Sequence, residues 1–116
     1  MKLIKKSVRM DDGGEQRRGH RIPVYVPVLF EGEGRTGQGS TFNVSTWGCA
    51  VESHVPMPTG LYVGVSFSLP DHRAPLQVEL AAVRWSRRNQ FGMEFLSISK
   101  ENRNRLEEFL AAKAIA

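Results

Sequence analysis

The chain has 116 residues, 41% hydrophobic and 24% charged, a composition typical of one globular domain with its own core. A single cysteine excludes an intramolecular disulfide and a multi-cysteine metal site, which fits a reducing compartment. No stretch approaches the roughly 18–20 apolar residues of a membrane span. The basic N-terminus is not followed by the apolar stretch of a signal peptide, so we expect a cytoplasmic protein.

The net charge of +4 is confined to one end of the chain. Residues 1–21 contain seven lysines and arginines against three acidic residues, whereas residues 22–116 contain nine residues of each sign. A general nucleic-acid-binding protein usually spreads a basic stripe over its folded surface. The distribution therefore favours a local anion site near the start of the chain, with a solvated basic tail as the simpler interpretation for residues 1–9.

The first 21 residues show little periodicity. Asp11-Asp12-Gly13-Gly14 is typical of a turn or linker, because paired glycines leave the backbone loose. We therefore predict a flexible basic leader over residues 1–16 and a single domain over residues 17–116. The domain begins with Arg17-Arg18-Gly19-His20-Arg21, which has no helix or strand pattern of its own.

Six extended segments follow. Alternation of apolar and polar residues predicts strands at about 24–30, 38–44, 49–52, 61–69, 76–85 and 91–95. In the fifth segment the apolar set changes parity, from Leu76, Val78 and Leu80 to Ala81, Val83 and Trp85. Such a one-residue shift predicts a β-bulge, which bends a strand around a barrel corner.

Two further details of these strands can be compared with a structure. Phe42 and Val44 are expected to point inward from the second strand. Pro27 lacks a backbone donor, which predicts a free edge or a bulge at that position of the first strand.

The period changes near the C-terminus. Ser99 is a plausible N-cap, and residues 100–113 are predicted to form a helix with Leu106, Phe109 and Leu110 on one apolar stripe. Successive short antiparallel strands with a bulge predict a small closed barrel, because closure removes exposed edges. The expected fold is therefore an all-β, six-stranded antiparallel barrel with a C-terminal helix across an open side or end.

Residues suited to catalysis are scattered. His20, His54 and His72 fall in predicted loops without metal-ligand spacing. Cys49 falls in a strand, where it is more often a small core residue than a nucleophile. Ser45 lacks the glycine-flanked elbow of a hydrolase, and no phosphate-binding loop of the GxxxxGK[ST] type is present. We expect neither an enzyme nor a metal site.

Arg17 and Arg21 are better suited to binding an anion. Arginine presents a planar fork that matches the O6/N7 edge of guanine or two phosphate oxygens, and two arginines on a flexible segment can surround one small dianion. The alternative is that they form surface ion pairs. Arg84 and Arg88 have the same spacing, yet they flank a predicted hairpin turn and no partner motif follows them. The spacing alone therefore carries little weight.

A second stretch, Asn43-x-Ser45-x-x-Gly48, supplies the partner motif. Asn43 and Ser45 offer short donors and acceptors at a strand end. Gly48 allows a close backbone approach to a ligand or a turn with positive φ. The alternative is a hairpin turn that uses these residues for turn geometry alone.

Together these residues resemble the signature of the PilZ domain family, RxxxR in an N-terminal loop followed by (D/N)xSxxG on a six-stranded barrel. The resemblance extends over about residues 16–112 and includes Val83-Arg84-Trp85, the strand 91–95 and the closing helix. PilZ domains are receptors for cyclic di-GMP, a bacterial second messenger.

The resemblance implies roles for particular residues. Arg17 and Arg21 would engage guanine edges and phosphates. Asn43, Ser45 and Gly48 would hold the opposite base and form the pocket floor. Arg18 would add a phosphate contact and His20 would be a stacking neighbour, both as weaker candidates. Gln16 lies where family members vary, and it bears on whether one ligand or a stacked pair binds.

The leading hypothesis is a non-enzymatic cyclic di-GMP receptor whose N-terminal arginine segment becomes ordered on the ligand and signals to an unidentified protein partner. One alternative is a PilZ-like adaptor that does not bind nucleotide. Another is a small barrel that stacks single-stranded nucleic acid on exposed aromatics, for which Tyr25, Trp47 and Tyr62 are candidates; nucleic acid is the less expected ligand. The pathway (motility, secretion, polysaccharide synthesis or transcription) is left open by the sequence, as are ligand stoichiometry and oligomeric state.

Overall fold

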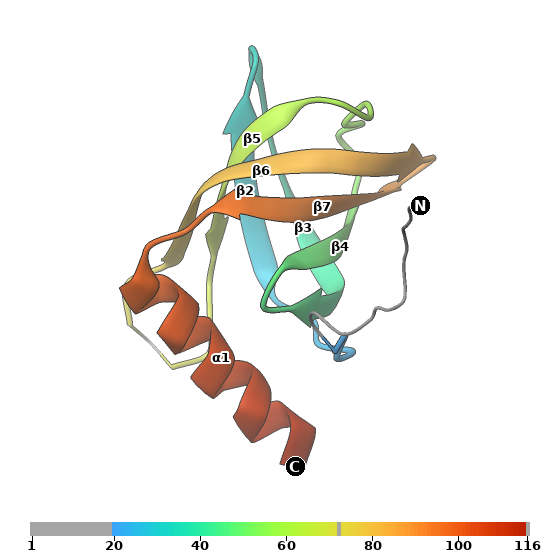
Figure 1. Cartoon of the computed structure of the whole chain (residues 1–116). Helices are drawn as coiled ribbons and strands as arrows, with labels where there is room; N and C mark the ends of the chain where they lie inside the picture. The colour runs from blue at the N-terminus through green and yellow to red at the C-terminus, as the bar shows by residue number, and fades with distance from the viewer. Residues whose placement is uncertain (1–19, 72, 116) are drawn as a thin grey trace, which may run out of the picture.

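The computed structural model describes residues 20–71 and 73–115, and these form a closed barrel of six antiparallel strands followed by a helix (Figure 1). Around the barrel the strand order is β2-β3-β4-β7-β6-β5, with β5 pairing back onto β2. The elements are β2 (Pro27–Gly32), β3 (Arg35–Ser45), β4 (Gly48–Ser53), β5 (Tyr62–Phe67), β6 (Leu76–Arg87), β7 (Gln90–Ser97) and α1 (Lys100–Ile115). The predicted all-β fold with a C-terminal helix is confirmed, whereas the predicted flexible leader lies outside the described residues.

Alternating side chains from all the strands fill the barrel. In β5 the inward residues Val63, Val65 and Phe67 are almost fully buried, as the period of two predicts. The ring of Phe67 meets that of Phe95 on β7 edge to face, with centroids 5.8 Å apart. Burying side chains of this size stabilises the fold by about 1.5–3 kcal/mol each, so the apolar interior is what closes the barrel.

The bulge predicted in β6 is present, with a register shift between Leu80 and Ala81. Because the pairing slips by one residue there, Leu80 is turned outward and is 38% exposed, while Ala81 is buried. The bulge thus falls at the parity change that the sequence shows, between Leu80 and Ala81.

A second bulge, in β3, was not predicted. The register with β4 shifts between Thr41 and Asn43, which leaves Phe42 half-buried and brings Thr41 into the interior. The buried hydroxyl of Thr41 accepts a hydrogen bond from the Val26 amide (2.9 Å) and donates one to the Val24 carbonyl (2.7 Å). The inward prediction is correct for Val44 and wrong for Phe42, because the bulge changes the parity between them.

Pro27 does not mark a free edge or a bulge. It is the first residue of β2, and this strand pairs with β3 on one side and β5 on the other. The first position of a strand tolerates a residue without an N–H group. The prediction of an open or bulged strand at Pro27 is therefore wrong.

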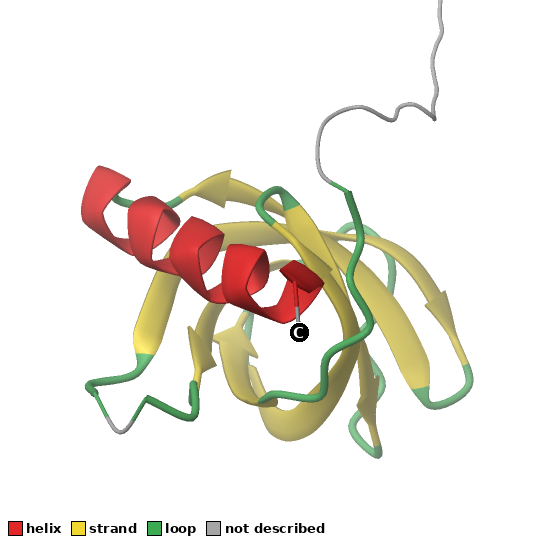
Figure 2. Ribbon diagram, turned by 90° about the horizontal axis from the view of Figure 1, so that it is seen from below, coloured by secondary structure: helices red, strands yellow, loops and turns green. Residues whose placement is uncertain are grey.

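Helix α1 lies across one end of the barrel (Figure 2). Ser99 caps it as predicted, since the Asn102 amide donates to the Ser99 hydroxyl at 3.1 Å. Leu106 and Leu110 are buried against the barrel and Phe109 is half-buried, so the predicted apolar stripe is the packed face. The helix extends two residues beyond the predicted end.

Residues 20–26 approach the same end of the barrel as a loop (Figure 2). Ile22 pairs with Val44 through two backbone hydrogen bonds, each of 2.9 Å, so the loop is hydrogen-bonded to the C-terminal end of β3. This short pairing is what positions the residue before it, Arg21, beside the Asn43–Gly48 stretch.

Candidate functional site

Arg21 and Asn43 meet at the outer wall of the barrel. The Arg21 Nη1 group donates a hydrogen bond to Asn43 Oδ1 at 2.6 Å, across 22 positions of sequence. The Ile22–Val44 pairing brings the two together, because each lies next to one of the paired residues. The structure thus brings one residue of each motif stretch together. Arg17 and Arg18 lie outside the described residues, and His20 is exposed.

Residues 45–48, which we call the site turn, connect β3 to β4. The Ser45 hydroxyl accepts a hydrogen bond from the Trp47 amide at 3.1 Å and donates one to the Gly48 carbonyl at 3.3 Å. The Trp47 carbonyl accepts from the Phe95 amide of β7 at 2.8 Å. Ser45 therefore stabilises its own turn, which is the turn chemistry that the sequence left open as an alternative.

Gly48 has a packing role that the sequence did not indicate. It is not among the glycines with positive φ, so that explanation of its presence is wrong. A Cβ added at Gly48 would lie 2.4 Å from the Met93 carbonyl oxygen. Glycine at this position thus lets β4 approach β7 closely at the edge of the site turn.

Next to Arg21 is a hollow of about 280 Å³ on the outside of β6 and β7, which we call the arginine hollow. Its lining comprises Arg21, Ser45, Trp47, Arg84, Trp85, Gly92, Met93 and Glu94. Trp85 lies across Gly92, where an added Cβ would clash with the indole at 2.0 Å. Two indole side chains, those of Trp47 and Trp85, therefore line one small hollow beside a guanidinium.

The charges of the arginine hollow do not cancel. Arg84 donates to Glu94 at 2.8 Å and forms a half-exposed ion pair with it. Arg21 has the neutral Asn43 as its partner, and among the described residues no carboxylate is paired with it. Partial burial lowers the pKa of Arg21 from its usual value, but a guanidinium stays protonated in proteins. Two guanidiniums and one carboxylate leave one positive charge in excess.

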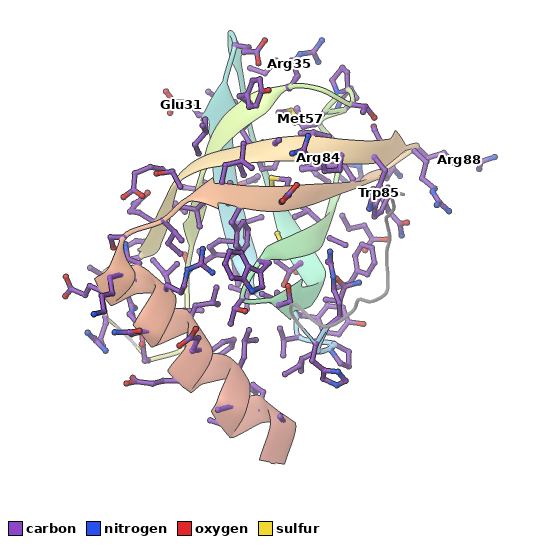
Figure 3. All side chains as sticks on the ribbon, in the orientation of Figure 1. Glu31, Arg35, Met57, Arg84, Trp85 and Arg88 are labelled. Carbon is purple, nitrogen blue, oxygen red and sulfur yellow. The ribbon has the colours of Figure 1, made fainter. Side chains whose placement is uncertain are left out.

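Arg84, Trp85 and Glu94 were not assigned to the site from sequence. The sequence signal for Arg84 and Trp85 is the Val83-Arg84-Trp85 pattern, which enters only as part of the resemblance. Arg84 and Arg88 share the four-residue spacing, yet the structure separates them. Arg84 lines the hollow, whereas Arg88 is at the tip of the β6–β7 hairpin with φ of 44° and points away from the barrel (Figure 3).

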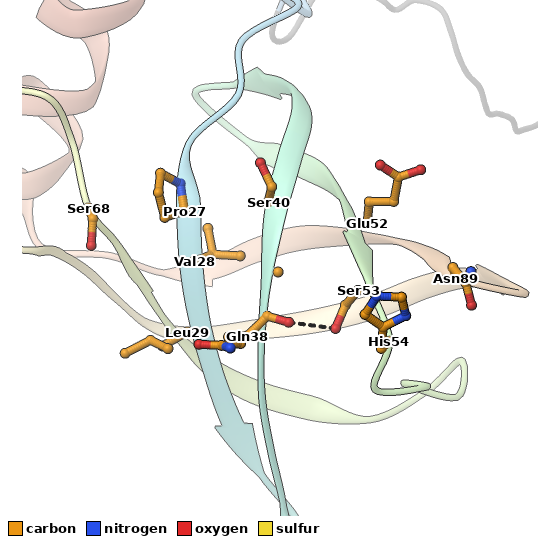
Figure 4. A pocket seen from close by; sticks show the side chains of 11 residues that line it. Pro27, Val28, Leu29, Gln38, Ser40, Glu52, Ser53, His54, Ser68 and Asn89 are labelled. Atoms are coloured by element: carbon orange, nitrogen blue, oxygen red, sulfur yellow. Dashed lines mark hydrogen bonds between the residues drawn. The ribbon is translucent and has the colours of Figure 1, made fainter.

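Larger hollows lie elsewhere on the barrel. One of about 730 Å³ is formed by the outer face of β2, β3 and β4, where the Ser53 hydroxyl donates to the Gln38 carbonyl (Figure 4). Another, of about 820 Å³, lies along β2, β3 and β5. Neither contains Arg21, Asn43, Ser45 or Gly48 in its lining. The larger hollows therefore lack the residues with binding chemistry.

Catalytic and metal-binding chemistry is poorly represented. Over residues 20–71 and 73–115, no group of three or more His, Cys, Asp and Glu side chains is placed to hold a metal. Cys49 is fully buried, and burial raises the pKa of its thiol to about 12, which leaves it neutral. Within the same residues, no helix combines the length and apolar character needed to cross a bilayer.

The fold defines a small closed β-barrel domain with a C-terminal helix, and Arg21 lies against the barrel's outer wall. The model of the PilZ domain matches residues 15–112, which is most of the chain. The chain therefore belongs to the PilZ domain family, a family of cyclic di-GMP receptors. A search of curated protein sequences finds no match.

Two solved structures share the fold. The Bacillus subtilis inhibitor of motility (MotI/DgrA) superposes with a TM-score of 0.72 at 19% identity, over 87% of this chain and 52% of that one. This chain thus spans about half the length of the motility inhibitor. The PilZ domain of CeSA from a cellulose-synthesizing bacterium gives a TM-score of 0.65 at 18% identity, over 80% of this chain and 96% of that one. At these identities the likeness concerns the fold.

Proposed function

We propose that this protein is a non-enzymatic cyclic di-GMP receptor that binds its ligand in the arginine hollow and signals to a protein partner. The observation that carries the proposal is the Arg21–Asn43 hydrogen bond, which holds a guanidinium at the edge of the hollow without neutralising it. A cyclic dinucleotide has two phosphate charges and two guanine bases, and an anion site with flat walls suits both parts.

Arg21 has donors to spare for a ligand. A guanidinium carries five N–H groups, and Asn43 accepts from one nitrogen of the fork. The remaining donors can address phosphate oxygens or the O6/N7 edge of guanine. Trp47 and Trp85 line the hollow, with Arg103 over the ring of Trp47 and Arg87 over that of Trp85. We propose that a purine stacks against these indoles from the side of the hollow, and such stacking contributes about 1–3 kcal/mol per base.

The described part of the site is small for this ligand. Pockets for small molecules generally measure about 300–1,000 Å³, and the arginine hollow has about 280 Å³. We propose that residues 17–20 supply the missing wall, with Arg17 opposite Arg21 and with Arg18 and His20 as weaker contacts. Binding would then fix the arginine segment, residues 17–21, across the outside of the barrel and change the surface offered to a partner in the cytoplasm.

The proposal is tested by calorimetric titration of the full chain with cyclic di-GMP at two salt concentrations, with GMP as a control ligand. Saturable binding that weakens with salt and falls at least about tenfold in Arg17→Ala is expected, because the variant removes a charge-assisted contact. Absence of heat with the wild-type chain would overturn the proposal.

Two results would redirect it. A partner that binds the wild-type chain equally well with and without cyclic di-GMP would favour an adaptor that does not respond to nucleotide. A steeply salt-dependent gel shift with oligonucleotides would favour a single-strand-binding barrel. For that case the exposed Tyr25 and Tyr62 are the residues to replace first.

A further inference from the structure

Helix α1 reaches the site turn through Arg103. This side chain projects from the first turns of α1 and is half-buried between the helix and the barrel. Its guanidinium donates a hydrogen bond to the Thr46 carbonyl and lies over the Trp47 ring, 4.1 Å from the centroid. One side chain of the helix thus holds both the backbone and the indole of the turn that lines the arginine hollow.

The end of α1 that carries Arg103 is firmly attached. Asn102 donates to the Gln77 carbonyl of β6 at 3.1 Å, and Arg105 pairs with Asp71 of the β5–β6 loop at 3.1 Å. The backbone amide of Arg103 itself closes on the Ser99 carbonyl at 2.9 Å. Three neighbouring residues of the helix therefore contact three different parts of the barrel, and Arg103 makes the contact that ends at the site.

The restraint acts on a residue that faces the ligand. Trp47 lines the arginine hollow and is 38% exposed. A guanidinium stacked on an indole restricts the ring to one orientation, and such stacking contributes about 0.5–2 kcal/mol. The Ser45 hydroxyl holds the Trp47 backbone amide of the same turn, whereas Arg103 contacts its ring.

We infer that Arg103 is a positioning residue for the nucleotide site, which fixes the Trp47 ring and the site turn and couples ligand occupancy to the attachment of α1. This inference rests on the proposed function for the identity of the ligand. Because coupling between a site and a distant element is reciprocal, a ligand that prefers the Arg103-held turn also tightens α1 on the barrel. Helix α1 is then the element through which the site communicates with a partner.

The test compares three substitutions in the full chain. Arg103→Met removes the hydrogen bond and the stacked charge, Arg103→Lys keeps the charge without the planar fork, and Lys113→Met removes one charge from the far end of α1. We expect cyclic di-GMP affinity to fall about five- to tenfold in Arg103→Met, less in Arg103→Lys, and less than twofold in Lys113→Met. Thermal unfolding of each variant separates a loss of positioning from a loss of folding.

Nuclear magnetic resonance supplies the readout that a merely structural role would not move. Without ligand, Arg103→Met should shift the Trp47 indole N–H signal and the amides of residues 46–48. With cyclic di-GMP, amides of residues 101–105 should shift in the wild-type chain and respond less in Arg103→Met. Folded Arg103→Met protein that binds as the wild type does, or an unmoved Trp47 signal, would overturn the inference.

Failure of the proposed function would look different. If the wild-type chain does not bind cyclic di-GMP, the receptor proposal fails. The ligand-free comparison of Trp47 signals then still decides whether Arg103 holds the turn, since it needs no nucleotide.

Discussion

Arg21 and Arg84 line the same hollow and differ in what each is bonded to. Arg21 donates to the amide oxygen of Asn43, whereas Arg84 donates to the carboxylate of Glu94. An amide partner orients a guanidinium and leaves its charge available, while a carboxylate partner orients it and cancels the charge. The positive charge available to an anion in this hollow is therefore that of Arg21 far more than that of Arg84, although both are arginines at the same surface.

The largest expected effect is the loss of that available charge. Arg21→Ala should weaken cyclic di-GMP binding about 10- to 100-fold, as expected for hydrogen bonds from a charged group. Arg84→Ala should weaken it only about two- to fivefold, because Glu94 already shares this guanidinium. Calorimetric titration of both variants measures the difference.

Arg88→Ala is the matched control, since it removes the same charge from the hairpin tip. We expect it to change the affinity by less than about twofold in dilute salt. Equal losses for all three arginines would mean that net charge, and not the partner of each guanidinium, controls binding.

The second prediction concerns the close contact between β4 and β7 at Gly48. Gly48→Ala should lower the free energy of unfolding by about 1–3 kcal/mol, because its Cβ meets the Met93 carbonyl, a backbone atom that cannot rotate away. Chemical denaturation measures this. Gly64→Ala is the control, since the nearest atom to its Cβ is 3.6 Å away and its stability should change little. A tolerated Gly48→Ala would mean that β4 and β7 can separate without cost.

Cys49, the residue after Gly48 in β4, supplies a smaller effect, on the pH dependence of the free energy of unfolding. Burial raises the pKa of Cys49 to about 12, above the value of about 9 of the unfolded chain. Between these values the folded state keeps the proton that the unfolded state has lost. The free energy of unfolding therefore falls as the pH rises through this window, by at most about 1.4 kcal/mol per pH unit from this group.

Cys49→Ala should remove that part of the alkaline slope, which denaturation at pH 8 and pH 10 detects. The result bears on Arg21 directly, since a thiolate here would be an anionic partner for its guanidinium. An unchanged slope in Cys49→Ala would show that the thiol ionises in the folded state and that Arg21 has a negative neighbour.

The smallest expected effect comes from giving Arg84 a neutral amide partner, as Arg21 has in Asn43. Glu94→Gln replaces the carboxylate with a neutral amide, which raises the excess charge of the hollow by one. Cyclic di-GMP affinity should increase about two- to fivefold at low salt, the size typical of an exposed ion pair. Glu79→Gln, at a residue that lines the 820 Å³ hollow and not the arginine hollow, should leave the affinity unchanged. Weaker binding by Glu94→Gln would indicate that Arg84 needs its carboxylate to be oriented.

The fold was predictable from the sequence because period-two alternation in strands and a capped apolar stripe in the helix are local signals. The error at Phe42 arises where the pairing register of β3 with β4 shifts. A bulge there is decided by which strand is the neighbour, not by the residue itself. The prediction at Pro27 was wrong for a different reason: Pro27 is the first residue of β2, where it still pairs with Ser40 and a missing N–H group is tolerated.

Part of the candidate site was equally predictable from the sequence. The meeting of Arg21 and Asn43 follows from a motif in which both residues are named. Arg84, Glu94 and Arg103 come from β6, β7 and α1, and only the barrel register brings them to the hollow or the site turn. Arg103 had no distinguishing local pattern, because one arginine in a charged helix looks like any other.

The close approach at Gly48 divides the family signature into two separable halves. Ser45 and Gly48 are required by the turn and by the contact with Met93, whether or not a nucleotide ever binds. Arg21 is instead bonded to the side chain of Asn43 and takes part in neither of these contacts. A duplicated copy of this domain could therefore lose its arginines in evolution and still fold, while the serine and glycine are retained. In such a descendant, Ser45 and Gly48 would indicate membership of the family, and only the arginines would indicate ligand binding.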